Sequence, residues 1–249
     1  MLASKSIGAI LVFYKTPLKQ KKSAMKQLSK IADKNMLVCI DNTNNNQGYA
    51  YGVNKGIRKL QKQKPDLLII ANPDIHLHDI TRSIIIDTAQ YFDIFGFPFR
   101  EKKQTYYSGV IDRLNMSGGF TQIREKKRYV KTDFVSGSLM CVKSKIFEKI
   151  GYFNTKYFMY YEDVEFCLRA KKNNKTVGIR TDVVYTHTSS STVDKEYYLI
   201  RNRLLTLFRY GTFKQKLHEL LALPKHCSIN MNNTKLRAFK GFIYQLLLK

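Results

Sequence analysis

Three short apolar runs near the start of the chain constrain its fold more than any other feature. IGAILVFY (7–14), MLVCIDN (36–42) and DLLIIANPD (66–74) each have the length and apolar character of a buried strand. Between them lie segments that suit helices, near 17–34 and 48–63. Strand, helix, strand, helix and strand in alternation are typical of a parallel sheet. The sequence therefore predicts an α/β fold with a mainly parallel, Rossmann-like sheet flanked by helices.

The pattern continues less regularly toward residue 194. We expect strands at 93–99 and 176–187, a short strand and a helix within 133–151, and a helix over 162–175. The basic run 124–131 is more typical of a solvated loop than of a binding site. These elements complete a predicted α/β domain over residues 1–194.

The charge of the chain is strongly positive. Its 249 residues include 43 Lys and Arg against 19 Asp and Glu, a formal net charge of +24. This balance favours an anionic partner, such as nucleic acid, an anionic membrane surface or a phosphorylated ligand, and does not choose among them. No apolar run approaches the roughly 18 residues of a membrane-spanning helix. The four cysteines form no CxxC pair, so we expect reduced thiols and no metal knuckle.

The C-terminal segment 195–249 differs in composition from the rest. It carries 11 Lys and Arg against Glu196 and Glu219, interleaved with apolar and aromatic residues. This pattern predicts basic amphipathic helices. Two interpretations stay open: the helices lie on an anionic membrane surface, or they pack on the core as an appendage with solvated lysines.

Acidic residues follow two of the predicted strands. In parallel α/β sheets, ligands bind beyond the carboxyl ends of the strands, where Asp41 and Asp74 stand. Asp41 is placed to accept hydrogen bonds from a base or ribose. Asp74 offers the carboxylate oxygen that Mg²⁺ and Mn²⁺ prefer, and such an ion can bridge the phosphates of a nucleotide sugar. The alternative for Asp74 is a simple Asn-Pro-Asp turn.

The loop after the second strand is rich in small residues. They recur at every second position: Asn46, Gly48, Ala50, Gly52, Asn54 and Gly56. Small residues allow the backbone to come close to a ligand or to a neighbouring element. A Gly/Asn turn that caps a helix is the alternative.

The stretch FMYYEDVEFCLR (158–169) concentrates carboxylates behind aromatic residues. Acidic side chains at a helix start are favoured by the helix dipole, which accounts for Glu162 and Asp163 but not for the aromatic residues before them. A carboxylate beside aromatics is partly desolvated and hence more basic, so it can take a proton from a sugar hydroxyl. His187, at the end of the last predicted strand, is either a further metal or diphosphate ligand beside Asp74 or an ordinary polar residue.

Taken in order, these motifs resemble the family-two glycosyltransferases with a GT-A fold, especially the bacterial rhamnosyltransferase-like branch. The resemblance runs from about residue 6 to residue 210. It rests on the DN…NxGxAxGxNxG block at 41–56, NPD at 72–74, SGS at 136–138, GYFNTKYFMYYEDVEFCLR at 151–169, His187 before SSST (189–192), and EYYLIRNRLLTLFRY at 196–210.

The resemblance implies a role for each matching residue. On the donor side, Asp41 would bind the base, Gly137 would lie near the donor sugar, and the remaining donor-site residues would be Asn46, Gly48, Asn54 and Asn72. Asp74 would hold the metal, assisted by His187. Asp163 would be the general base of an inverting displacement, and Glu162 would help to orient the acceptor or the base.

Two departures from the family pattern bear on these roles. The metal motif is NPD, so Asp74 is its one acidic residue, and Asn154 stands where the family often has Asp. The chain contains no Trp, which excludes the QxxRW signature of processive synthases and favours a single-transfer enzyme.

The leading hypothesis is a glycosyltransferase that adds one sugar to a lipid-linked saccharide during assembly of a bacterial surface glycan (O-antigen, capsule or lipopolysaccharide). The donor would be dTDP-rhamnose, UDP-galactofuranose, UDP-glucose or UDP-galactose. We expect a cytoplasmic protein, peripheral on the inner membrane, and no nucleic-acid partner. The alternatives are a basic nucleic-acid-binding module and a catalytically silent homologue. The sequence leaves the sugar, acceptor, linkage and oligomeric state open.

Overall fold

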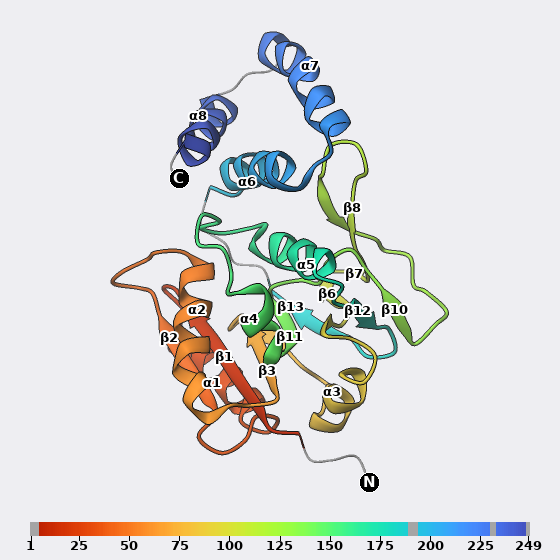
Figure 1. Ribbon diagram of the computed structural model, residues 1–249. Coiled ribbons are helices and arrows are strands. Elements are labelled where there is room, and N and C mark those ends of the chain that lie inside the picture. Colours follow the sequence, from red (N-terminus) through yellow and green to blue (C-terminus); the bar gives the residue numbers. More distant parts are fainter. Residues whose placement is uncertain (1–4, 189–193, 230–232, 248–249) are drawn as a thin grey trace.

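A twisted sheet forms the centre of the molecule (Figure 1). The computed structural model describes residues 5–188, 194–229 and 233–247, with the backbone alone for 223–229. Within these residues the sheet has the order β10-β12-β5-β11-β3-β1-β2, and all strands except β10 and β11 run in one direction. The strands are β1 (Ile7–Phe13), β2 (Leu37–Asp41), β3 (Leu67–Ala71), β5 (Ile94–Gly96), β10 (Tyr129–Lys131), β11 (Leu139–Lys143) and β12 (Val177–Arg180). The predicted α/β fold is confirmed.

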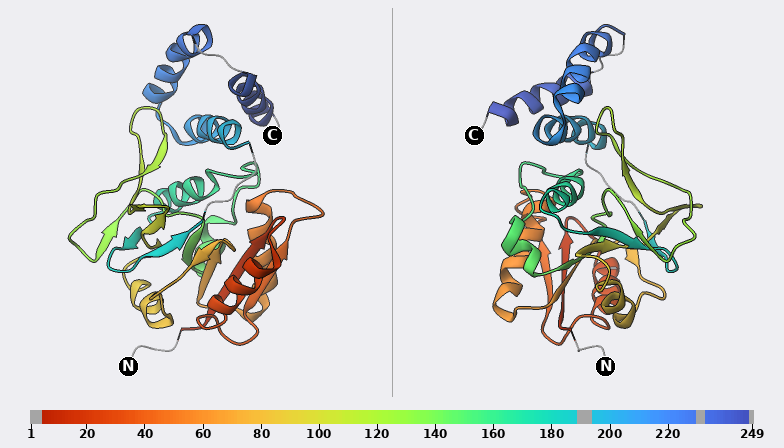
Figure 2. Two further views of the ribbon diagram at one scale, coloured as in Figure 1. Left: turned by 180° about the vertical axis from the view of Figure 1, so that it is seen from behind. Right: turned by 45° about the vertical axis from the view of Figure 1, so that its right-hand side comes forward.

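Helices cover both faces of this sheet (Figure 2). They are α1 (Leu18–Leu28), α2 (Tyr49–Leu60, continued by a 3-10 turn at Gln61–Gln63), α3 (Arg82–Thr88), α4 (Lys145–Ile150) and α5 (Glu162–Lys172). Side chains of a strand alternate between its two faces. Ile10 and Val12 of β1 therefore pack with α2, α4 and α5, whereas Ala9 and Leu11 pack with α1 and α3.

Two of the predicted strands are each divided between two sheets. The run 93–99 forms β5 and then β6 (Phe99–Glu101), and the run 176–187 forms β12 and then β13 (Tyr185–His187). Arg180 turns back to pair with Asp182 just after β12, which ends that strand. The second sheet has the order β4-β13-β6-β7, with β4 (Ile75–His76) and β7 (Gln104–Tyr106).

The predicted loop at 124–131 is partly a strand. Its last three residues form β10, which pairs with the edge strand β12. The preceding basic residues are exposed, as expected. A two-stranded ribbon, β8 (Gly109–Ile111) and β9 (Gly118–Phe120), extends from the body.

The C-terminal residues form helices at the end of the molecule opposite the N-terminus (Figures 1 and 2). They are α6 (Lys195–Tyr210), α7 (Phe213–Ile229) and α8 (Asn233–Leu247). Leu204 and Leu207 of α6 are buried in the core cluster that also contains α5, so α6 is continuous with the α/β body. None of the described helices is both long and apolar enough to cross a membrane.

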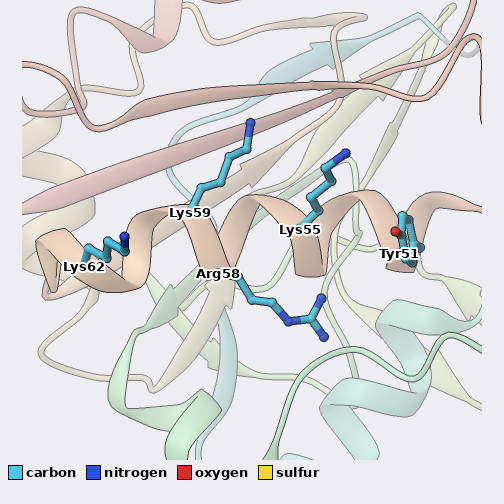
Figure 3. A pocket seen from close by; sticks show the side chains of 5 residues that line it. All are labelled: Tyr51, Lys55, Arg58, Lys59 and Lys62. Atoms are coloured by element: carbon cyan, nitrogen blue, oxygen red, sulfur yellow. The ribbon is translucent and has the colours of Figure 1, made fainter.

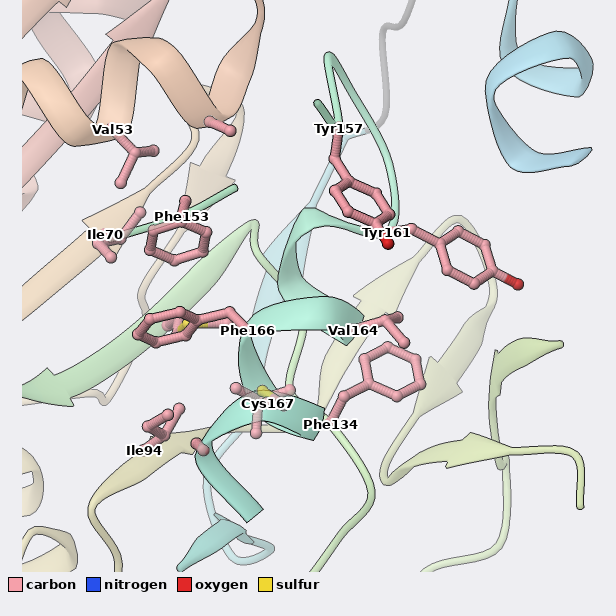
Figure 4. Close-up of a cluster of buried hydrophobic side chains, with 14 of the residues drawn as sticks. Val53, Ile70, Ile94, Phe134, Phe153, Tyr157, Tyr161, Val164, Phe166 and Cys167 are labelled. Carbon is pink, nitrogen blue, oxygen red and sulfur yellow. The ribbon is translucent and has the colours of Figure 1, made fainter. Parts of the chain in front are cut away.

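Helix α5 is held on the sheet by a dense apolar cluster (Figure 4). Phe166 stacks on Phe153 with ring centroids 4.3 Å apart. Val164 and Cys167 of α5 are buried in the same cluster. Each such large apolar side chain contributes about 1.5–3 kcal/mol when buried. The first turn of α5, which carries Glu162 and Asp163, is therefore fixed relative to the sheet.

Candidate active site

A cavity of about 750 Å³ opens at the carboxyl ends of β1, β2 and β3 and extends over the start of α5. Seven of the residues predicted for the site line it: Asn46, Asn72, Asp74, Gly137, Glu162, Asp163 and His187. Aromatic side chains line it as well, including Phe99, Tyr106, Phe120, Phe134 and Tyr161. Residues from widely separated segments of the sequence thus meet around one space that combines carboxylates with apolar walls.

Glu162 and Asp163 are neighbouring carboxylates at the start of α5, of which Glu162 is buried and Asp163 is half-buried. Asp163 Oδ2 accepts a hydrogen bond from the Gly137 N–H at 2.8 Å, and its Oδ1 accepts one from the Val164 N–H at 2.8 Å. Glu162 is 6% exposed, and its Oε2 has no hydrogen-bond partner among the described residues. Burial, together with the charge of Asp163, raises the pKa of Glu162 well above its usual value. Burial also raises the pKa of Asp163, against the lowering effect of the backbone N–H groups.

Glu165, the third carboxylate of this stretch, lies outside the cavity. It is fully buried and pairs with Arg169 one turn along α5, at 3.0 Å. Arg169 also donates to the Tyr152 carbonyl, and Tyr210 donates to Glu165. Glu165 therefore joins α5 to its neighbours, while Glu162 and Asp163 face the cavity.

Asp74 and His187 lie together because β4 and β13 pair. Ile75 is opposite His187 in that antiparallel register, and the Thr188 N–H donates to the Asp74 carbonyl at 2.9 Å. His187 Nε2 is 3.4 Å from Asp74 Oδ1, which is buried and has no hydrogen-bond partner in the described part of the chain. The predicted hydroxyl-rich run 189–192 lies outside the described residues.

This Asp74–His187 pair fits a divalent cation. A buried carboxylate oxygen without a hydrogen-bond partner lowers the stability of the fold unless a ligand or ion binds it. Carboxylate and imidazole groups both bind divalent first-row metal ions, the class to which Mn²⁺ belongs. The described residues contain no group of three or more His, Cys, Asp or Glu side chains that could hold a metal by themselves. Oxygens of a bound diphosphate would therefore have to complete the coordination.

A network of hydroxyl groups lies beside the cavity; its two serines belong to the SGS motif, whereas its tyrosines were not predicted. The Tyr49 hydroxyl donates to the Gly137 carbonyl at 2.8 Å. Ser138 Oγ is 2.7 Å from the Tyr185 hydroxyl and 2.8 Å from Ser136 Oγ. Burial and the nearby carboxylates raise the pKa of Tyr49, so it stays a neutral donor. Isolated tyrosines in apolar runs give no sequence signal for such a role.

The segment after β1 also lines the cavity and was missed. Tyr14, Lys15 and Thr16 follow directly on the first buried strand. The argument that placed Asp41 and Asp74 at strand ends applies equally to them, so this signal was present in the sequence. Lys15 has a φ of +47°, which is uncommon for a residue with a side chain.

Asp41 stands at the expected strand end but does not line the cavity. Its Oδ2 is 2.5 Å from Lys21 Nζ on α1, and its Oδ1 accepts the Thr43 N–H. These contacts lower the pKa of Asp41 to about 2. The base of a nucleotide that binds Asp41 would have to compete with the Lys21 ammonium group for the Asp41 carboxylate.

Gly48 and Asn54 make contacts within the protein rather than with the cavity. Gly48 has a φ of +94°, and a Cβ there would lie 2.4 Å from the Phe158 carbonyl oxygen. Asn54 is buried and exchanges two hydrogen bonds with the Phe153 backbone, at 2.8 and 3.0 Å. Both residues fix α2 against the segment that leads to Glu162. Gly48 and Asn54 therefore serve close approach to a neighbouring element, whereas Asn46 of the same block lines the cavity.

A second depression, of about 430 Å³, lies on the outer face of α2 (Figure 3). Its lining residues are Tyr51, Lys55, Arg58, Lys59 and Lys62. It shares no residue with the first cavity and contains no carboxylate. It therefore lacks the groups that the predicted chemistry requires.

Sequence comparisons find glycosyltransferases among known proteins. No protein-family model matches the chain. The low-salt glycan biosynthesis hexosyltransferase Agl10 of Haloferax volcanii is 32% identical over an alignment of 145 positions that covers 53% of this chain and 46% of Agl10. The rhamnosyltransferase WbbL of Escherichia coli is 26% identical over an alignment of 142 positions that covers 49% of this chain and 54% of WbbL. The chain thus spans about half the length of the curated relatives that it matches.

Solved structures resemble the chain over nearly its whole length. GalNAc-T7 with UDP, GalNAc and Mn²⁺ superposes with a TM-score of 0.65 at 11% identity, covering 97% of this chain and 56% of that one. The mannosyltransferase PcManGT of Pyrobaculum calidifontis, in complex with GDP-Man and Mn²⁺, gives 0.56 at 11%, covering 98% and 82%. The chain therefore has the GT-A glycosyltransferase fold. The fold and the resemblance to glycosyltransferases that the motifs predicted are confirmed.

Proposed function

We propose that this chain is an inverting glycosyltransferase that moves one sugar from a nucleotide-diphosphate donor to a hydroxyl of an acceptor. The observation that carries the proposal is the Glu162–Asp163 pair of neighbouring carboxylates, which faces the same cavity as Asp74 and His187. Carboxylates of raised pKa suit removal of a proton from a hydroxyl. The names of the relatives, a hexosyltransferase and a rhamnosyltransferase, support the same reaction class.

Asp163 is the proposed general base. The acceptor hydroxyl gives its proton to the carboxylate while its oxygen forms a bond to the anomeric carbon of the donor. The bond from that carbon to the diphosphate breaks, and its electron pair leaves with the nucleoside diphosphate. The Gly137 and Val164 N–H groups hold Asp163 in place, and each of its oxygens keeps a lone pair for the acceptor.

Glu162 is the competing candidate for the base, because its Oε2 is unpartnered within the described residues. Burial and the charge of Asp163 raise its pKa and so favour its protonated form, which would orient the acceptor by donating a hydrogen bond. Substitution of each carboxylate separates the two assignments.

Asp74 and His187 would hold a divalent cation, Mg²⁺ or Mn²⁺, whose chemistry is to neutralise the charge on the departing diphosphate. Asn46, Asn72 and Gly137 line the same cavity and would contact the donor. The aromatic side chains opposite them, such as Tyr106 and Phe120, would form the apolar wall of a sugar site.

The proposed donor is dTDP-rhamnose or a UDP-hexose, including UDP-galactofuranose. The proposed acceptor is a lipid-linked saccharide in bacterial surface-glycan assembly. The protein would work in the cytoplasm, peripherally on the inner membrane. The basic C-terminal helices, which expose Leu217, Leu220 and Leu221, support this location.

The test is transfer by purified protein from each of the four donors to a lipid-diphosphate-linked saccharide, with the product's anomeric configuration read by NMR. Asp163→Asn should lower kcat by about 10²–10⁴-fold, the usual contribution of a general base. If Glu162→Gln has that effect and Asp163→Asn does not, Glu162 is the base. If no donor yields a transfer product or releases nucleoside diphosphate, the enzyme proposal is contradicted. That result would favour a catalytically silent homologue.

A further inference from the structure

The segment just before the two carboxylates has an unusual backbone. Tyr160 and Tyr161 have φ values of +64° and +67°, so two consecutive residues with side chains lie in the left-handed region. That region is disfavoured for such residues and persists only where surrounding contacts impose it. Because Glu162 follows directly, the direction in which α5 starts depends on this conformation.

The contacts that impose it come from α6. Asn202 is fully buried, and its Nδ2 donates to the Met159 carbonyl at 2.8 Å and to the Tyr160 carbonyl at 2.7 Å. Its Oδ1 accepts from Arg201 Nε at 2.8 Å, which fixes the orientation of the amide. The amide nitrogen of one side chain thus holds two successive carbonyls of a strained turn. Its amide oxygen accepts from Arg201.

Two further contacts tie the same turn to the body. The Tyr161 hydroxyl accepts the Gly118 N–H at 2.9 Å, on the far side of the turn from α6. Arg201 donates to the Lys156 carbonyl at 2.8 Å, a few residues upstream. Because Arg201 also orients the Asn202 amide, helix α6 determines the conformation of the turn from one side.

We propose that Asn202 is a positioning residue for sugar transfer: it holds the Met159–Tyr161 turn and thereby sets where Glu162 and Asp163 stand in the cavity. This inference rests on the proposed function. Asn202 touches neither carboxylate, so it acts through the turn. Helix α6 is accordingly part of the active site, and Lys195 and Leu199 on it also line the cavity.

Packing alone does not account for an asparagine at position 202. An apolar residue would be the ordinary choice at a fully buried helix position, and an amide is tolerated only where its hydrogen bonds are made. The bonds that Asn202 makes go to the two carbonyls of the turn that precedes the carboxylates. Removal of the amide leaves these carbonyls without their donor and releases the turn toward ordinary backbone angles.

The test compares Asn202→Ala and Asn202→Asp with Leu204→Ala. Aspartate keeps the shape of asparagine but replaces both donors with an oxygen that repels the carbonyls. Leu204 is buried on the same helix and is not part of the cavity, so its truncation matches the loss of packing. The measurements are kcat, KM for the nucleotide sugar, and backbone hydrogen exchange over residues 157–165.

Both Asn202 variants should lose about 100-fold in kcat, as expected when reacting groups are displaced by about 1 Å, with KM for the donor within twofold of wild type. Exchange at 159–163 should rise in both variants and stay unchanged in Leu204→Ala. Wild-type kcat in the Asn202 variants, or an equal loss in Leu204→Ala, would overturn the inference. If the wild-type protein transfers no sugar, the proposed function fails, while the exchange data still decide whether Asn202 holds the turn.

Discussion

Glu162 carries the most unfavourably placed carboxyl group of the candidate site. It is almost completely buried, one of its oxygens is unpartnered within the described residues, and Asp163 is its neighbour. Such an arrangement destabilises the ionised form in the folded protein. A fold retains a group of this kind where function requires it, because a neutral or apolar side chain would be more stable there.

The Glu162→Gln variant should therefore be more stable than wild type, by about 1–3 kcal/mol at neutral pH. The folded-state pKa of Glu162 lies above its ordinary value of 4.5, so the folded protein holds a proton that the unfolded chain has lost. Wild-type stability consequently falls as pH rises from about 4.5 through the raised pKa. Denaturant unfolding from pH 4 to pH 8 measures the difference, which should widen with pH. Glu148→Gln, at an exposed glutamate of α4, should show no such trend, and a constant difference for Glu162→Gln would contradict the prediction.

The C-terminal helices differ in how far they bury their apolar residues, and α8 leaves Tyr244, Leu246 and Leu247 exposed. α6 buries its leucines, whereas Phe213, Leu217, Leu220 and Leu221 of α7 are exposed, with Phe213 at 81% and Leu221 at 72%. These four positions have the spacing of one helix face. Packing on the core, one of the two interpretations of segment 195–249, therefore applies to α6. Helix α7 has the exposed apolar face that the other interpretation, binding to a membrane surface, requires.

The protein should bind vesicles that contain anionic phosphatidylglycerol and should not bind purely zwitterionic ones. A Leu220→Asp, Leu221→Asp double variant should lose roughly a hundredfold or more in affinity, since each leucine buried in lipid contributes about 1.5–3 kcal/mol. Vesicle flotation measures this, with Leu18→Asp, at an exposed leucine of α1, as the control. Equal binding to both kinds of vesicle, or no effect of the double variant, would count against membrane docking through α7.

At the scale of the whole molecule, the cavity joins segments that are distant in the sequence, from Val12 of β1 to Leu199 of α6. A ligand that fills it would contact several segments that unfolding separates. Binding to the folded state alone raises the unfolding midpoint. Ligand-dependent stability is therefore a direct measure of which nucleotide the cavity accepts.

Addition of UDP or dTDP at about 100 times its dissociation constant, with Mn²⁺, should raise Tm by roughly 5–10 °C. Removal of the metal with EDTA should take away part of this shift, and Asp74→Asn should lose the same part. Thermal unfolding with UDP, dTDP, GDP and CDP makes the comparison. No response to any of them, combined with salt-sensitive binding of RNA or DNA, would favour the nucleic-acid alternative.

The sequence alone determined the α/β fold, because burial of a strand imposes an apolar run and each crossover imposes a helix between runs. It also indicated Asp74, Glu162, Asp163 and His187, since polar residues at element ends are visible against apolar neighbours. The division of 176–187 between two sheets was not visible, because both halves read as one extended run.

Only the tertiary structure decided which polar groups face the cavity. Asn54 and Glu165 look like the other motif residues in sequence, yet each is satisfied by a partner in the packed body. Asn202 lies about 40 residues from the turn that it holds, and no local sequence pattern predicts that contact. Local propensity and periodicity are properties of neighbouring residues, whereas the partner of a buried polar group is chosen by the packing of distant elements.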